Sequence, residues 1–178
     1  MSLANAEGAE ASAATASSLV LRSYHDGLEI IMFEPRYRDD FKRLNVAWLQ
    51  RYFRVEPIDE QVLGHPEREI LNGGGAILFA RLEDRIVGTV ALKPEEQGGF
   101  ELTKMAVDEA FQGRGFGKRL LDVACDHAKS LGAPRVILYS QRTLQAAVAM
   151  YAKYGFVEMP LTDKRYARCD IKMQRVLI

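Results

Sequence analysis

The segment Phe100–Leu121, FELTKMAVDEAFQGRGFGKRLL, decides how the rest of the chain is organised. Its first part, Phe100 to Val107, is mostly apolar and has the length of a strand. Asp108 to Gln112 interrupts this run, and glycines at 113, 115 and 117 follow. Beyond them, apolar residues recur at three- and four-residue spacing, which predicts a helix. They are Phe116, Leu120, Val123, Ala124, Ala128 and Leu131.

A strand, a glycine-rich turn and a helix start together predict an anion-binding site. The first N–H groups of a helix lack intrahelical acceptors and carry a partial positive charge. Glycines let an oxygen-rich ligand approach that backbone closely. Phosphate is the expected ligand, although a tight turn with no ligand has the same pattern.

Two common phosphate-binding patterns do not fit this turn. A Walker A loop needs Gly-x-x-x-x-Gly-Lys-Ser/Thr. Gln112 stands where its first Gly belongs, and Arg119 stands where Ser or Thr belongs. The dinucleotide pattern Gly-x-Gly-x-x-Gly fails because Lys118 occupies its third glycine position.

A second local pattern lies downstream, after a strand predicted over Arg135 to Ser140. Thr143 to Phe156 reads as a helix with one apolar face. Gly155 stands in the C-terminal capping position, so the helix ends as Tyr151-x-x-x-Gly155-Phe156.

Together the two patterns resemble the GNAT superfamily of N-acetyltransferases. Gln112-x-x-Gly115-x-Gly117 resembles its acyl-coenzyme A pyrophosphate loop, and a helix ending in Tyr-x-x-x-Gly-Phe is common at this later position. The resemblance extends from about Gly75 to the C-terminus, and more loosely back to Leu19. It implies acetyl-CoA as co-substrate, direct transfer to a primary amine and no metal.

The remaining elements are predicted from periodicity and from turn residues. They are a strand at Leu19–Tyr24, a helix at Arg36–Arg54, helical turns from Pro57 interrupted at Gly64–Pro66, a hairpin of Ala76–Leu82 with Ile86–Leu92, and final strands at Val157–Leu161 and Ala167–Leu177. This order predicts an α/β (α+β) fold. The resemblance implies a mixed, mostly antiparallel central sheet flanked by helices.

Length and composition indicate one domain. The chain has 178 residues, of which 48% are hydrophobic, so we expect residues 19–178 to form a single domain and the Ala- and Ser-rich residues 1–18 to be a disordered tail. Lys plus Arg equals Asp plus Glu at 24 each, and no long apolar run occurs. Neither a nucleic-acid nor a membrane partner is therefore expected. Two cysteines and no signal peptide indicate the cytoplasm.

The resemblance implies roles for two groups of cofactor-binding residues. The strand residues Met105, Ala106 and Val107 match positions whose backbone holds the pantetheine arm and supplies an oxyanion N–H. The pyrophosphate loop matches Gln112, Gly113, Arg114, Gly115, Phe116, Gly117 and Lys118. Arg114 and Lys118 either add charge to the diphosphate or are solvated surface cations.

Two residues are candidates for proton transfer. Tyr151 matches a general acid that protonates the leaving thiolate, although its helix face fits a core position equally well. Glu101 matches a strand carboxylate that some histone acetyltransferases of the superfamily use as a base. A water chain is the alternative, and Glu101 is then an exposed strand residue paired with Lys104 or Arg81.

The acceptor is not identified by the sequence. The resemblance places it against roughly Tyr37–Arg54 and Leu161–Arg168. The residues that fit its walls are Trp48, Tyr52 and Phe53, and the carboxylates that fit an amine are Glu56, Asp59 and Glu60. One departure from the family pattern is Leu144, where many relatives carry an Asn that contacts pantetheine.

Three functions stay open. The first is an N-acetyltransferase acting on a small-molecule or protein amine, with a homodimer allowed. The second is a catalytically silent acyl-CoA-binding sensor or partner domain. The third is a protein for a different phosphate ligand, which the failed Walker and dinucleotide patterns disfavour.

Overall fold

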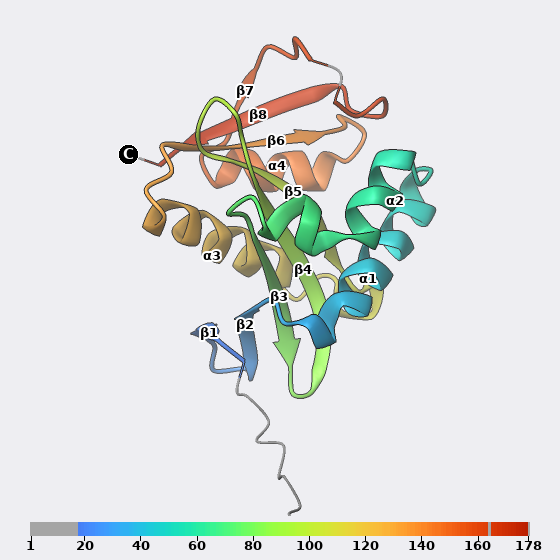
Figure 1. The fold of residues 1–178 in the computed structure, drawn as a ribbon, viewed down its shortest axis with the longest axis vertical. Helices are drawn as coiled ribbons and strands as arrows, with labels where there is room; N and C mark the ends of the chain where they lie inside the picture. Colours follow the sequence, from blue (N-terminus) through green and yellow to red (C-terminus); the bar gives the residue numbers. More distant parts are fainter. Residues whose placement is uncertain (1–17, 164, 178) are drawn as a thin grey trace, which may run out of the picture.

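A computed structural model describes residues 18–163 and 165–177, which form one eight-stranded sheet with helices on both faces (Figure 1). The strands are β1 (Val20–Ser23), β2 (Leu28–Met32), β3 (Ala76–Leu82), β4 (Arg85–Pro94), β5 (Phe100–Val107), β6 (Arg135–Ser140), β7 (Val157–Met159) and β8 (Ile171–Val176). The helices are α1 (Arg38–Tyr52), α2 (Pro57–Gly64), α3 (Phe116–Ser130) and α4 (Gln145–Lys153), with short turns η1 (Pro35–Tyr37), η2 (Glu67–Leu71) and η3 (Glu109–Phe111).

The two faces of the sheet bury different helices. Successive strand residues point to opposite faces, so Leu78 and Ala80 of β3 face one core while Ile77 and Phe79 face the other. The first core contains the apolar side of α3 with residues of α4 packed against it, and the second contains α1, α2 and η2. Because β3 and β4 are buried on both faces, they read as nearly continuous apolar runs.

The strand pairing of the sheet becomes parallel and short at β5. Its order is β1-β2-β3-β4-β5-β6-β8-β7, and all neighbouring pairs are antiparallel except β5 with β6. This parallel pairing covers only two positions, Phe100 with Val136 and Glu101 with Ile137. On the other edge, the register between β4 and β5 shifts near Lys104, whose φ is +51°. Beyond Leu102, β5 therefore separates from β6, and its backbone on that side has no strand partner among the described residues.

The predicted fold class is confirmed: the sheet is mixed, mostly antiparallel and flanked by helices. The predicted strands at 100–107 and 135–140 have the observed bounds. The helix predicted from Arg36 starts as a short 3-10 turn and becomes α-helical at Arg38. Strand β2 was not predicted; it forms a hairpin with β1 around Gly27, whose φ is +82°. The tail predicted for residues 1–18 lies outside the described residues except for Ser18.

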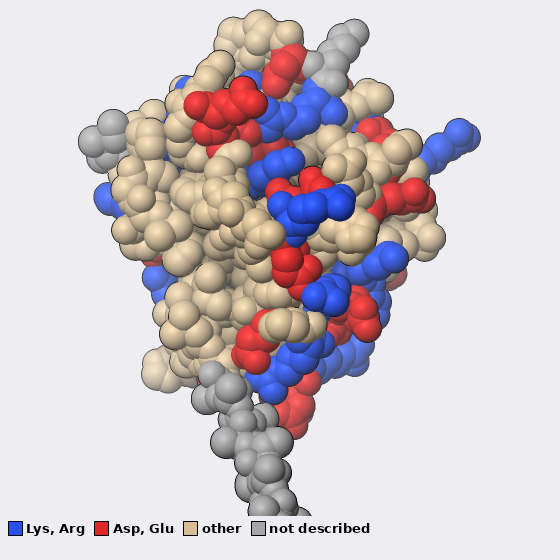
Figure 2. Space-filling view, viewed as in Figure 1, with Lys and Arg blue, Asp and Glu red and all other residues tan. Residues whose placement is uncertain are grey.

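The surface mixes charges of both signs. On the face drawn in Figure 2, blue and red side chains alternate along the right-hand side. Ion pairs between surface residues include Arg43 with Asp40 and Arg38 with Glu67. Within the described part of the chain, no helix has the length and apolar character that spanning a bilayer requires.

Gly99 holds the start of β5 against β6, and two adjacent glycines allow a matched test. Both Gly98 and Gly99 have a left-handed φ, at +86° and +88°. A Cβ on Gly99 would lie 2.2 Å from the carbonyl oxygen of Arg135, whereas the nearest atom to a Cβ on Gly98 is a Pro134 side-chain carbon at 4.0 Å. We expect Gly98→Ala to cost about 1–2 kcal/mol of unfolding free energy, from backbone strain alone.

Gly99→Ala is expected to cost about 3 kcal/mol or more, because backbone cannot move aside as a flexible side chain can. Urea unfolding followed by circular dichroism measures both values. Equal losses in the two variants would contradict the role given to Gly99.

Candidate active site

A groove of about 740 Å³ follows the open side of β5. Its floor and walls come from β5, from the turn before α3 and from the start of α4. They include Met105, Ala106, Val107, Gln112, Gly113, Gly115, Gly117, Lys118, Leu144, Ala147 and Tyr151. The groove therefore brings together most of the residues that the sequence assigned to a cofactor, in the gap that the divergence of β5 and β6 leaves.

The turn before α3 presents a row of backbone donors. In the described structure, none of the N–H groups from Gly113 to Lys118 donates to a protein acceptor, and the first such bond of the helix runs from Arg119 N to Gly115 O. Gly115 is the N-cap residue, with a φ of +78° and no side chain to occupy these donors. Such a cluster of unpaired N–H groups at a helix N-terminus suits a phosphate.

The polar side chains of this turn make different contacts. The Gln112 amide nitrogen donates to Val107 O at 3.2 Å, so this side chain fixes the turn to the end of β5. Lys118 lines the groove with an exposed side chain. Arg114 does not line it, because its guanidinium lies over the rings of Phe111 and Phe116 at 5.6 and 4.9 Å.

The ending of α4 explains the Tyr-x-x-x-Gly-Phe pattern in physical terms. Gly155 has a φ of +84°, and its N–H donates to Ala152 O while Phe156 N–H donates to Tyr151 O. These two bonds form a Schellman cap. The rings of Tyr151 and Phe156 meet with centroids 6.0 Å apart. The cap thus holds the backbone and ring of Tyr151 in place at the base of the groove.

The surroundings of Tyr151 favour the protonated form of its phenol. Its ring packs against the core with partial exposure, and burial raises the pKa of its hydroxyl to about 12. Among the described residues, no side chain or backbone group hydrogen-bonds to this hydroxyl.

Leu144 occupies the N-cap position of α4 and supplies no side-chain oxygen to the helix. The neighbouring Thr143 and Gln145 both line the groove. The Thr143 hydroxyl donates a hydrogen bond to the side-chain oxygen of Gln141 at 2.9 Å. Gln145 is therefore the neighbour whose side-chain amide makes no hydrogen bond in the described structure.

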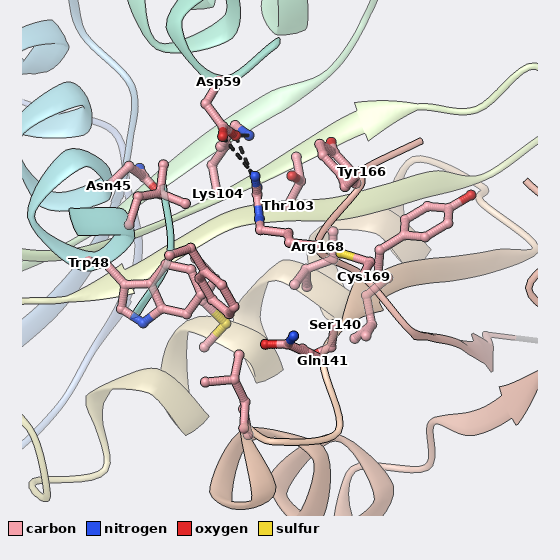
Figure 3. Close-up of a pocket in the computed structure, with 18 of the residues that line it drawn as sticks. Asn45, Trp48, Asp59, Thr103, Lys104, Ser140, Gln141, Tyr166, Arg168 and Cys169 are labelled. Atoms are coloured by element: carbon pink, nitrogen blue, oxygen red, sulfur yellow. Dashed lines mark hydrogen bonds and ion pairs between the residues drawn. The ribbon is translucent and has the colours of Figure 1, made fainter. Parts of the chain in front are cut away.

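A smaller hollow of about 100 Å³, which we call the chamber, adjoins the groove (Figure 3). The residues that line both hollows are Trp48, Met105, Leu144, Ala147 and Tyr151. Tyr151 therefore stands where the groove meets the chamber. Of the residues predicted to fit the acceptor walls, Phe53 lines the chamber, whereas Tyr52 is 42% exposed and lines the groove.

Glu101 lies in the chamber wall, although not with the expected partners. Its carboxylate is 1% exposed, accepts a hydrogen bond from the Tyr166 hydroxyl at 2.8 Å and pairs with Arg165. The interpretation of Glu101 as an exposed residue paired with Lys104 or Arg81 is wrong, because Lys104 pairs with Asp59 and Arg81 with Glu29.

A buried ion cluster closes the other end of the chamber. Figure 3 shows Asp59, Lys104 and Arg168 converging there, opposite Gln141. Lys104 Nζ lies 2.7 Å from Asp59, and Arg168 reaches the same carboxylate with two nitrogens at 2.8 and 3.0 Å. Burial opposes the charge of Asp59, but the Arg168 hydrogen bonds and Lys104 hold its pKa below the ordinary value. Burial likewise lowers the pKa of Lys104, against the pull of Asp59.

This cluster corrects the expectation that Asp59 attracts an amine, since the carboxylate is 0% exposed and already paired. Tyr166 and Arg168 lie in the segment Leu161–Arg168 that the resemblance placed against the acceptor, although neither was named individually, and Lys104 was not predicted as a site residue. Lys104 sits in an apolar strand, and a lysine in such a run is the signal that could have identified it.

No group of His, Cys, Asp and Glu side chains in the described residues is arranged to hold a metal ion. What the site does offer is a row of amide donors, an open strand edge, a phenol and a buried carboxylate around two connected hollows. Groups of these kinds can support an acyl transfer to an amine.

Comparisons with known proteins agree with this geometry. The model of the acetyltransferase (GNAT) family matches residues 32–156, which is more than half of the chain. A mycothiol acetyltransferase of Jonesia denitrificans is 41% identical over 76 residues, covering 42% of this chain and 24% of that protein. An uncharacterised N-acetyltransferase of Escherichia coli is 29% identical over 109 residues, covering 58% of this chain and 65% of that protein. The chain thus spans about a quarter of the mycothiol acetyltransferase.

Solved structures share the fold. A GNAT-family acetyltransferase from Staphylococcus aureus superposes with a TM-score of 0.75 at 23% identity, covering 85% of this chain and 99% of the other. An acetyltransferase from Bacillus subtilis in complex with CoA gives a TM-score of 0.66 at 22% identity, with the same coverage of both chains.

Asp59→Asn tests the buried ion cluster. Removing this charge leaves Lys104 and Arg168 without their shared counter-ion, and breaking a buried pair typically costs about 3–5 kcal/mol of unfolding free energy. Because the folded-state pKa of Asp59 is depressed, the stabilisation is fully present above the unfolded pKa near ~4 and fades as the pH falls further. The difference in unfolding free energy between wild type and variant should therefore narrow as the pH falls below about 4.

Chemical denaturation above and below about pH 4 measures this difference in unfolding free energy between wild type and Asp59→Asn. Asp39→Asn is the control, because Asp39 is exposed in the first turn of α1 and its loss should cost under about 1 kcal/mol. A gap that widens in acid would contradict the depressed pKa.

Proposed function

Because the chain belongs to the acetyltransferase (GNAT) family, we propose that it transfers the acetyl group of acetyl-coenzyme A directly to a primary amine. The observation that carries this proposal is the row of N–H groups at Gly113–Lys118, which have no protein acceptor in the described structure and open onto the groove along β5. A diphosphate satisfies such donors.

The groove residues fit the cofactor in two parts. The N–H groups of Gly113–Lys118 bind the diphosphate, with Lys118 adding charge at the groove wall. The open edge of β5 at Met105–Val107 pairs with the amide groups of the pantetheine arm, since β6 has already separated there. Gln145 is the groove residue best placed by the chain to take over the contact that an Asn makes in many relatives.

A backbone N–H of Met105–Val107 also serves as the oxyanion donor. A donor of this kind, fixed before the reaction, contributes about 3 kcal/mol to stabilising the charge that develops on the carbonyl oxygen. The register between β4 and β5 is irregular at Lys104, next to this donor.

Tyr151 acts as the general acid. With its pKa at about 12 the phenol keeps its proton at neutral pH. It donates this proton to the sulfur as the carbon–sulfur bond breaks, and the phenolate takes back the proton that the acylated amine nitrogen loses. Its position between groove and chamber supports this role, because the thioester and the amine must meet there.

Glu101 is the base in this proposal. An alkyl ammonium titrates near ~10.4, so about one molecule in 2,500 is neutral at pH 7 and a proton must be removed before attack. The Glu101 carboxylate accepts two hydrogen bonds among the described residues, from Tyr166 and Arg165. A carboxylate has about four acceptor sites, so two remain for the acceptor ammonium or for a water that relays its proton.

Release of free coenzyme A from acetyl-coenzyme A, measured across a panel of amines, tests the function. We expect amine-dependent thiol release, and a thermal shift with coenzyme A that exceeds the shift with ATP. Binding of coenzyme A with no release for any amine would favour a silent acyl-CoA-binding domain. The absence of any coenzyme A binding would overturn the proposal as a whole.

Tyr151→Phe should lower kcat by about 10²-fold, the low end of the range for general acid catalysis, because a thiolate already leaves readily. Stability should change little, since the hydroxyl has no hydrogen-bond partner in the described structure. Tyr154→Phe is the control, because Tyr154 packs against the same core from the end of α4 but lines neither hollow. Wild-type turnover in Tyr151→Phe would remove this residue from the mechanism.

Glu101→Gln should lower the rate at pH 7, and the deficit should shrink as the pH approaches the pKa of the acceptor amine, near ~10. At high pH the neutral amine forms without a base. Rate profiles from pH 6 to 10 measure this, with Glu96→Gln as control because Glu96 is exposed and lines neither the groove nor the chamber. A deficit that is independent of pH would point to a structural role for Glu101.

A further inference from the structure

The Asp59 carboxylate has no capacity left for a ligand. It accepts four hydrogen bonds, from Lys104 Nζ at 2.7 Å, from two Arg168 nitrogens at 2.8 and 3.0 Å and from Glu56 N at 3.0 Å. A carboxylate offers about four acceptor sites. Asp59 can therefore neutralise part of the charge beside it, but it cannot hold an acceptor ammonium.

The two cations beside Asp59 have donors to spare. The Lys104 side chain is 4% exposed and lines the chamber, and in the described structure only one of its three ammonium donors has an acceptor. Arg168 also lines the chamber, and its Nε donates to no described group. These donors face the chamber and can accept further hydrogen-bond partners, so this wall is suited to a ligand that brings oxygen atoms.

The other charges around the chamber do not cancel this arrangement. Glu56 lies 3.4 Å from Arg168 but does not line the chamber. The remaining carboxylate in the wall is Glu101, which keeps two acceptor sites and shares Arg165 with Glu95. One side of the chamber therefore offers acceptors, and the Lys104 side offers donors.

We propose that Lys104 and Arg168 bind a carboxylate of the acceptor, so that the enzyme acetylates small amines of the amino-acid type rather than polyamines. This inference rests on the proposed function. The chamber volume of about 100 Å³ suits a compact ammonium-and-carboxylate head group, with the ammonium toward Glu101 and the carboxylate toward Lys104. A positive wall beside the amine also favours its neutral, reactive form.

Matched amine pairs test the inference. L-phenylalanine is compared with phenethylamine and with L-phenylalaninamide, and L-methionine with 3-(methylthio)propylamine, by the kcat/KM of thiol release. The wild-type enzyme should prefer each amine that carries the carboxylate. Equal or faster acetylation of the carboxylate-free amines would overturn the inference and leave the proposed function standing.

Lys104→Met should reduce that preference about tenfold or more, the size of a lost charge-assisted hydrogen bond. The kcat/KM for the carboxylate-free amines should fall by less than that for the amino acids, and the affinity for coenzyme A should stay within about twofold, because Lys104 does not line the groove. Lys153→Met is the matched control, because Lys153 is an exposed lysine on α4 that lines neither hollow. An unchanged preference in Lys104→Met would overturn the inference. If Lys104→Met does not fold, Arg168→Gln replaces it, because this variant keeps the pair of Lys104 with Asp59. The same preference is then measured, as the kcat/KM for each amino acid relative to its carboxylate-free partner.

A binding measurement separates this inference from the proposed function. Calorimetry compares N-acetyl-L-phenylalanine with N-acetylphenethylamine, each titrated into the coenzyme A-saturated protein. If coenzyme A binds but no amine of the panel is acetylated, the proposed function fails. Tighter binding of the ligand that carries the carboxylate would still support a carboxylate site at Lys104 and Arg168. Equal affinity for the two ligands would overturn it.

Discussion

The separation of β5 from β6 is the constraint on which the site depends. Only two residue pairs join these parallel strands, at the end where Gly99 lies against Arg135. A buried strand edge without partners is costly, because backbone N–H and C=O groups need hydrogen bonds. Here the edge opens onto a groove instead of a neighbouring strand. A ligand with amide groups can complete the sheet there, which is why the proposed cofactor site needs so few specialised side chains.

Two helix ends meet at this opening, and each is specified by a glycine. At the start of α3, Gly115 caps the helix without a side chain and leaves the first N–H groups unpaired. At the end of α4, Gly155 completes the cap that fixes Tyr151. The first end offers unpaired N–H groups to an anion, and the second positions a single phenol. The fold thus supplies binding and positioning from backbone geometry, and leaves the chamber walls to vary with the acceptor.

Local features could be predicted from the sequence, whereas contacts between distant segments could not. The turn at 113–117 and the helix ending at Gly155 depend on residues a few positions apart, so their glycines predict them directly. The partners of Glu101 stand 64 and 65 positions away, in the loop before β8. The Asp59 cluster joins α2, β5 and the same loop. No periodicity encodes such pairings. The short β2 was missed for a related reason, because its place in the sheet depends on β3 rather than on its own five residues.

The buried ions of the chamber are better explained by chemistry than by stability. Well-packed apolar side chains in place of a buried ion pair are often neutral or stabilising, so the cluster of Asp59, Lys104 and Arg168 is weak support for the fold itself. Asp59 is saturated, so it does not compete with Glu101 for the acceptor ammonium, while it still keeps two cations in a buried wall. The one chamber carboxylate with open acceptor sites among the described residues is Glu101, the group that the proposed mechanism needs as a base.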